Sequence, residues 1–117
     1  MAFKFEKLTV WQLALDLSSD IGDLTKTFPK NEIYVLTSQI KRAADSIALN
    51  IAEGSTGQSN PEQIKFLGYS LRSAIEVVAC LHIAKKRKLI DENQFMKLYN
   101  QTEMMIVKIQ AFRKTLK

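Results

Sequence analysis

The chain has 117 residues, of which 46% are hydrophobic and 25% are charged, and its formal net charge is +5. This length fits one domain with its own core, and the composition excludes a disordered chain. The basic balance favours a polyanionic partner such as RNA or DNA, although simple solubility also explains an excess of this size.

The sequence carries no signal for export or for a membrane. The first residues, MAFKFEKLTVWQL, mix charges with apolar side chains and so lack the continuous apolar centre of a signal peptide. No segment approaches the roughly 18 uncharged apolar residues that span a bilayer. Cys80 is the only cysteine, which rules out a disulfide within the chain. We therefore expect a cytoplasmic protein with no membrane contact.

The first predicted helix covers residues 9–28. Its apolar side chains recur at intervals of three and four, which places them on one face. Thr9 and Gln12 have the spacing of a capping box, and Pro29 ends the pattern because the residue before a proline disfavours the helical region. The apolar face consists of Val10, Leu13, Leu17, Ile21, Leu24 and Phe28.

The second predicted helix covers residues 31–53, and a polar run that is typical of a turn follows it. Gly54 suits the helix end because glycine accepts the left-handed conformation that helix ends often need. The apolar face of this helix consists of Ile33, Leu36, Ile40, Ala43, Ile47 and Ile51.

The third and fourth predicted helices cover residues 61–88 and 92–116. Asn60 is expected to cap the third helix, with Pro61 at its first position, and Asp91 is expected to cap the fourth. The apolar face of the third helix consists of Ile64, Leu67, Leu71, Ala74, Val78 and Leu81. That of the fourth consists of Phe95, Leu98, Thr102, Met105, Ile109, Phe112 and Leu116.

The four faces share one spacing, and no segment alternates as a half-buried strand does. The short connections favour antiparallel neighbours. The sequence therefore predicts an all-α fold, an antiparallel up-and-down four-helix bundle that forms a single domain over residues 1–117.

The second helix also carries a polar stripe on one flank. One interpretation is a solvated face. The alanines beside the stripe allow close approach and favour a contact with another helix or subunit. The stripe consists of Gln39, Arg42, Ser46, Asn50 and Glu53.

Glu76 is a charged residue on a largely apolar helix. Antiparallel packing around the turn at residues 54–60 would bring residues 72–76 near residues 38–42. We therefore predict an ion pair between Arg42 and Glu76, since the planar guanidinium suits a carboxylate partner. The alternative is that both are unpaired surface charges.

Candidate residues for chemistry are few. His82 is the only histidine and lies one turn after Val78, a position more typical of a packed side chain than of a ligand. One histidine and one cysteine cannot supply a zinc site, and no Glu-x-x-His pair for a di-iron site occurs. A glycine-rich phosphate loop and a spaced Ser–His–Asp set are also missing. We predict no enzymatic activity, no catalytic residue, no metal and no cofactor.

Basic residues are expected to collect at the two ends of the folded bundle. No basic run is interleaved with aromatic residues as in a base-reading surface, and solvated helix ends are favoured over phosphate binding as the explanation of both groups. Carboxylates dilute the first group, whose candidate nucleic-acid-binding residues are Lys26, Lys30, Lys85, Lys86, Arg87 and Lys88. The other end collects Lys4, Lys7, Lys65, Arg113, Lys114 and Lys117.

The run LTSQIKRAADSIALNIAEG resembles the four-helix-bundle family encoded within intervening sequences of bacterial 23S ribosomal RNA genes. The resemblance extends to FEKLTVWQLALDL near the N-terminus and to FPKNEIYV before that run. FLGYSLRSAIE in the third helix matches more loosely, because Arg72, Ser73 and Ala74 stand where the family favours Gly-Ser before a leucine.

The resemblance implies a four-helix bundle that assembles as a homo-oligomer, in rings of five, without enzymatic activity. The family also resembles the accessory protein of diversity-generating retroelements, a pentamer that binds nucleic acid and a reverse transcriptase. We expect a structural role for Arg42 and Glu76 and an oligomer or partner surface at Asn50 and Glu53. Carried over by position, the family motif falls on Gln39, Arg42, Ala43, Ser46, Asn50, Ile51, Ala52, Glu53, Gly54, Ser73 and Glu76.

Two hypotheses for the function follow. The first is a non-enzymatic homo-oligomeric bundle that binds structured nucleic acid through basic surfaces, because repetition by symmetry strengthens weak contacts. The alternative is a protein-interaction scaffold or adaptor with no direct nucleic-acid contact. It would use apolar side chains that lie off the main faces, namely Trp11, Leu15, Tyr34 and Leu49.

Overall fold

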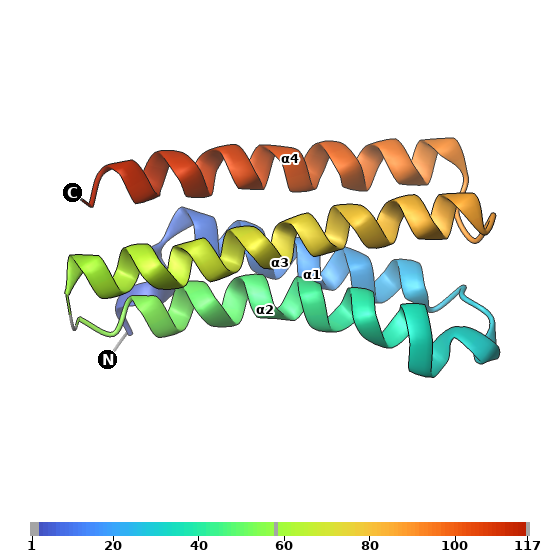
Figure 1. Cartoon of the computed structure of the whole chain (residues 1–117), viewed down its shortest axis with the longest axis horizontal. Helices are drawn as coiled ribbons and strands as arrows, with labels where there is room; N and C mark the ends of the chain where they lie inside the picture. The colour runs from blue at the N-terminus through green and yellow to red at the C-terminus, as the bar shows by residue number, and fades with distance from the viewer. Residues whose placement is uncertain (1–2, 58, 117) are drawn as a thin grey trace.

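The computed structural model describes residues 3–57 and 59–116, and within them four antiparallel helices form one bundle of 43 × 25 × 20 Å (Figure 1). The helices are α1 (Thr9–Thr25), α2 (Ser38–Gly54), α3 (Asn60–Lys86) and α4 (Glu92–Lys114), and a short 3₁₀ turn, η1 (Lys4–Lys7), precedes them. The predicted all-α, up-and-down four-helix bundle is confirmed.

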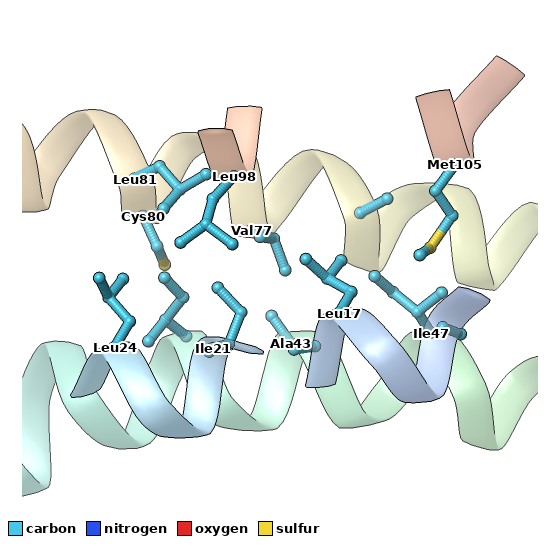
Figure 2. Close-up of a cluster of buried hydrophobic side chains, with 14 of the residues drawn as sticks. Leu17, Ile21, Leu24, Ala43, Ile47, Val77, Cys80, Leu81, Leu98 and Met105 are labelled. Atoms are coloured by element: carbon cyan, nitrogen blue, oxygen red, sulfur yellow. The ribbon is translucent and has the colours of Figure 1, made fainter. Parts of the chain in front are cut away.

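The core lies between the four helices, and each helix contributes side chains to it (Figure 2). Leu17 of α1, Ile47 of α2 and Leu81 of α3 are fully buried, and Ile109 of α4 is buried with them. All four belong to the faces predicted from the spacing of apolar residues, because a helix in a bundle buries one such face.

The buried face of α3 is rotated relative to the predicted one. Leu71 and Val78 are half-buried, whereas their neighbours Ser70 and Val77 are fully buried. The Ser70 hydroxyl donates to the Ile47 carbonyl of α2 at 2.9 Å, so this buried polar group is satisfied. Among the described helices, α3 alone has the length and composition to cross a membrane, a test that core helices also pass.

Hydrogen bonds confirm one predicted helix cap and correct another. The Asp91 carboxylate accepts from the Gln94 N–H at 2.7 Å, and the Gln94 side chain accepts from the Asp91 N–H at 2.9 Å, so Asp91 caps α4 as predicted. The cap of α3 is Ser59 instead of Asn60. Its hydroxyl accepts from the Glu62 N–H at 3.2 Å, which makes Asn60 the first helical residue.

Both ends of α1 differ from the predicted helix. Its N-cap is Leu8, so the capping box predicted at Thr9 is wrong. Gln12 donates instead to the carbonyl of Glu6 at 3.1 Å, because η1 leads almost directly into the helix. At the other end α1 stops at Thr25, and residues 26–28 form a turn.

The segment before α2, predicted as the start of one helix at residue 31, has two different turns. A 3₁₀ turn, η2 (Lys30–Glu32), is followed by a π-helical turn, η3 (Ile33–Thr37). A π turn has more residues per turn than an α-helix, so the side chains before Ser38 do not continue the buried face of α2. Ile33, predicted in the core, is therefore 44% exposed, and Tyr34 is 94% exposed.

The turn between α2 and α3 depends on close packing at Gly54. This residue ends α2, and a β-carbon added to it would lie 2.7 Å from the β-carbon of Phe66. Glycine is therefore needed at position 54 because a side chain would collide with Phe66, and not because the backbone is left-handed. The glycine in the left-handed region is Gly57, whose φ is 89°.

The end of α3 has a second left-handed residue, Lys88, with φ of 62°. The Leu89 N–H donates to the Ala84 carbonyl at 2.9 Å, and the Lys88 N–H donates to the Lys85 carbonyl at 3.0 Å. These two bonds form a Schellman motif, in which the left-handed position favours glycine. A lysine there is strained by about 1–2 kcal/mol relative to a right-handed residue.

We expect Lys88→Gly to raise the free energy of unfolding by about 1 kcal/mol, because glycine adopts this conformation without strain. Urea denaturation measures the change. Lys86→Gly in the last turn of α3 is the control and should lower stability by about 1 kcal/mol, the usual cost of glycine in a helix. A loss of stability in both variants would contradict the left-handed assignment.

Candidate nucleic-acid interface

The six candidate cations lie at one end of the bundle, where the α1–α2 and α3–α4 connections meet (Figure 1). The two connections touch through Arg87, whose Nη1 donates to both carboxylate oxygens of Glu32, at 3.0 and 3.2 Å. We call this surface the loop end; it carries Lys26, Lys30, Lys85, Lys86, Arg87 and Lys88.

Half of the loop-end cations are paired with carboxylates. The Lys85 ammonium also lies 4.5 Å from the centre of the Phe95 ring. Exposed ion pairs add little stability, but each carboxylate lowers the positive potential that a phosphate would meet. The three ion pairs are Lys26–Asp23 at 3.2 Å, Lys85–Glu92 at 2.7 Å and Arg87–Glu32 at 3.0 Å.

A second basic surface lies on the outer side of α3, near its start. Lys65, Tyr69 and Arg72 are separated by four and three residues, so they share one exposed face of the helix. With Arg113 of α4 they line a shallow pocket of about 380 Å³, which we call the α3 pocket. Among the described residues that line this pocket, none is acidic.

Arg113 is positioned by α3. Its Nε donates to the Ile64 carbonyl at 3.1 Å, and its Nη2 lies 3.0 Å from where a β-carbon at Gly68 would be. Glycine at this position therefore leaves room for the guanidinium against the helix. Nε makes the only side-chain hydrogen bond of Arg113 within the described residues, so its terminal nitrogens keep donors for a ligand.

Tyr69 places an aromatic ring between two of the cations. Its side chain is at the surface, and its ring meets the ring of Phe66 edge-on at 5.5 Å. Cations that hold phosphates beside an aromatic ring that stacks a base are typical of surfaces that bind unpaired nucleotides. The sequence predicts Lys65 and Arg113 at the same end of the bundle, and they lie there. Tyr69 and Arg72 are not predicted as part of this surface, although the spacing within KFLGYSLR contains the pattern of basic and aromatic residues.

Two side chains of the polar stripe of α2, Gln39 and Asn50, form hydrogen bonds, and the predicted Arg42–Glu76 ion pair is wrong. Glu76 accepts instead from the Gln39 side chain at 3.4 Å, because the register of α2 and α3 brings Gln39 opposite it. Asn50 donates to the Ser46 carbonyl at 2.9 Å. Arg42 is exposed and forms no ion pair with any residue in the described ranges.

Two other family-motif positions lie at the α2–α3 turn, where Glu53 is exposed and Gly54 is buried. Ser73 lies in the middle of α3 and is half-buried. Packing against Phe66 explains Gly54. An oligomer or partner surface at Asn50 and Glu53 stays a prediction.

His82 is exposed and contacts two aromatic rings, whereas Cys80 is buried. The His82 ring lies edge-on to Phe95 at 4.9 Å and to Tyr99 at 6.2 Å. Burial, with a smaller contribution from the Glu76 carboxylate, raises the pKa of Cys80, so its thiol stays protonated at neutral pH. Within residues 3–57 and 59–116, no group of three His, Cys, Asp or Glu side chains could hold a metal ion.

Comparison with protein-family models matches residues 6–111 to the 23S rRNA-intervening sequence protein. The fold is also similar to that of a crystal structure from Bacteroides thetaiotaomicron, a protein with unknown function from the S23 ribosomal protein family. The two chains are 26% identical and superpose with a TM-score of 0.83, over 91% of this chain and 99% of that one. No curated protein matches the chain.

Proposed function

The chain belongs to the 23S rRNA-intervening sequence protein family, and we propose that it is a non-enzymatic, homo-oligomeric bundle of the cytoplasm that binds structured nucleic acid. The α3 pocket is the main contact, and the loop end is a weaker one. The observation that carries this proposal is that, within the described structure, the residues lining the α3 pocket include cations and no acid.

The chemistry of the α3 pocket suits a phosphate backbone with an unpaired base. Lys65, Arg72 and Arg113 surround one hollow, and each can neutralise a phosphate. The planar guanidinium groups can also bind phosphate oxygens in pairs. Tyr69 can stack a base that is exposed in a loop or bulge of a folded RNA.

Assembly of several subunits would place several α3 pockets on one particle. A homo-oligomer, with a ring of five as the expected form, presents one α3 pocket per subunit to the same polyanion. Contacts that are weak alone then combine, because later contacts form within the complex already made. This repetition compensates for the small size of a single pocket.

Replacing Lys65 and Arg72 together by glutamate should lower the affinity for a structured RNA at least about tenfold. Two phosphate contacts are lost and two repulsive charges are added. Fluorescence anisotropy with a labelled RNA hairpin and a DNA duplex, at about 50 and 200 mM salt, measures this. Wild-type binding should weaken steeply between the two salt concentrations, and binding of the variant should depend less on salt.

The matched control replaces Lys85 and Lys86 by glutamate, which changes the same number of charges in the same helix. It should reduce affinity clearly less than the α3-pocket variant. An equal loss in both would mean that net charge, and not the pocket, determines binding. If the wild type does not bind at the lower salt concentration, the nucleic-acid proposal fails.

A protein-interaction scaffold is the second candidate, favoured by exposed apolar side chains. Leu15, Tyr34 and Leu49 are exposed, whereas Trp11 packs edge-on against Phe5 at 4.8 Å. This function becomes the better one if the titration finds no nucleic-acid binding. A co-purifying protein that is lost on Leu15→Ser or Tyr34→Ser would support it.

A further inference from the structure

We propose how the copies meet in the homo-oligomer, and this inference rests on that part of the proposed function. A ridge on α2 of one copy docks into the groove between α1 and α4 of the next. Arg42 of the ridge lies against Asp16 and Asp20 of the groove. The α3 pocket belongs to neither surface and stays free for a ligand.

The groove follows the seam between α1 and α4. Three hollows of about 380, 410 and 270 Å³ lie one after another along this seam, in the direction of α1. Apolar side chains of both helices line every hollow. They are Leu8, Val10 and Phe112 in the first, Leu13, Met104 and Met105 in the second, and Leu24 and Leu98 in the third.

The centre of the groove is acidic. Asp16 and Asp20 are the charged residues among those that line the middle hollow. They belong to α1, which has three aspartates and neither lysine nor arginine between Thr9 and Thr25, in a chain whose net charge is +5. The middle of the groove therefore favours a cationic group, and the apolar side chains in the outer hollows can pack against apolar groups on either side of it.

The outer side of α2 has this character. Arg42 and Leu49 are seven residues apart and follow one stripe along α2, and Val35 precedes that stripe in the π turn. All three are exposed, Val35 by 53% and Leu49 by 61%. We call these three residues the α2 ridge. Its central guanidinium has no carboxylate partner in the described part of the chain.

The ridge and the groove also match in length. Val10 and Leu24, which line the outer hollows, are fourteen positions apart on α1, as Val35 and Leu49 are on the ridge. Fourteen α-helical residues span about 21 Å, which is the separation of Val10 and Leu24 along α1. Lys7 and Lys108 also line the first hollow, and Asp23 and Lys97 also line the third. Asp16 lies between Val10 and Leu24 on α1, as Arg42 lies between Val35 and Leu49, so the arginine meets aspartate when the apolar side chains enter the outer hollows.

The occupant of the groove is a second copy of the same chain, because one chain carries both complementary surfaces. Contact between two different surfaces joins copies head to tail, and such contacts close into a ring when the rotation permits. The docked arginine gains charge-assisted hydrogen bonds that it does not have in the single chain. This contact gives Arg42 a role between subunits, in place of the predicted pair with Glu76.

Charge reversal with rescue tests the contact. Arg42→Glu should convert the oligomer to a monomer, and Asp16→Arg combined with Asp20→Arg should do the same. Combining all three changes should restore the wild-type mass, because a glutamate on the ridge then meets two arginines in the groove. Size-exclusion chromatography with light scattering gives the masses.

Lys41→Glu is the matched control, since it reverses a neighbouring cation that lies off the ridge, and it should leave the mass unchanged. Leu49→Ser disrupts the ridge without reversing a charge and should also give a monomer. Circular dichroism melting identifies any variant that fails to fold.

The measured masses separate failure of the homo-oligomer from failure of the contact between ridge and groove. A monomeric wild type would overturn the homo-oligomer, and this contact with it. An oligomeric wild type whose mass survives both Arg42→Glu and Leu49→Ser would overturn the contact alone. Folded single variants that are monomeric, with a combined variant that stays monomeric, would also overturn the pairing of Arg42 with the aspartates.

Discussion

Replacing Leu17 by alanine is expected to lower the free energy of unfolding by about 2–5 kcal/mol. Leu17 is fully buried on α1, and its side chain points into the centre of the bundle near Ala43 and Ile47 (Figure 2). The change removes apolar contacts and leaves a cavity that a close-packed core refills only in part. Urea denaturation followed by circular dichroism measures the loss.

Leu15→Ala is the matched control, because it is the same substitution two positions earlier on the same helix. Leu15 is 43% exposed, so its truncation leaves no buried cavity and should lower the free energy of unfolding by less than about 1 kcal/mol. Similar losses in the two variants would contradict the placement of the α1 face in the core.

The fold is predictable because each helix buries one regular face. Leu17 and Ile109 are found in the core because a period of three and four selects the side of a helix that can meet its neighbours. On α3 the same rule selects Leu71 and Val78, which are half-buried, whereas the position before each of them is fully buried. The buried residues of α3 keep the three-and-four spacing, but the spacing alone does not decide which of two adjacent stripes faces α2 and α4.

Local details depend on contacts that a single segment does not contain. Ser59 and Asn60 are both favoured cap residues, and the choice between them follows from which side chain reaches the Glu62 N–H. Ile33 has the spacing of a core residue. It lies outside the core because a π turn interrupts the α-helical period before Ser38.

The candidate site is predictable only in part, for a similar reason. The up-and-down order brings the loop-end cations together, but pairing of Arg87 with Glu32 joins residues that are far apart in the chain. The spacing of Lys65 and Arg72 is visible in the sequence. The up-and-down order places Arg113 at the same end as Lys65, as predicted, whereas its position beside Tyr69 and Arg72 depends on the register between α3 and α4.

Gly54→Ala is expected to lower the free energy of unfolding by about 1–3 kcal/mol, the usual cost of overpacking a well-packed contact. The new β-carbon would lie 2.7 Å from the β-carbon of Phe66 and 3.5 Å from the Gln63 carbonyl oxygen. The β-carbon of Phe66 is fixed to the backbone of α3 and cannot swing aside as the end of a long side chain can. The start of α3 must therefore shift away from the end of α2. Thermal and urea denaturation both report the change.

Gly22→Ala provides the control with the opposite sign. Gly22 lies inside α1, and a β-carbon added there would have no atom within 4 Å apart from those of the neighbouring helix backbone. Alanine is a better helix former than glycine, so this variant should gain up to about 1 kcal/mol. A Gly54→Ala variant that is as stable as the wild type would mean that α2 and α3 are not held this closely. The positional match of Gly54 to the family motif would then need an explanation outside the packing of one subunit, such as a contact between copies at the turn.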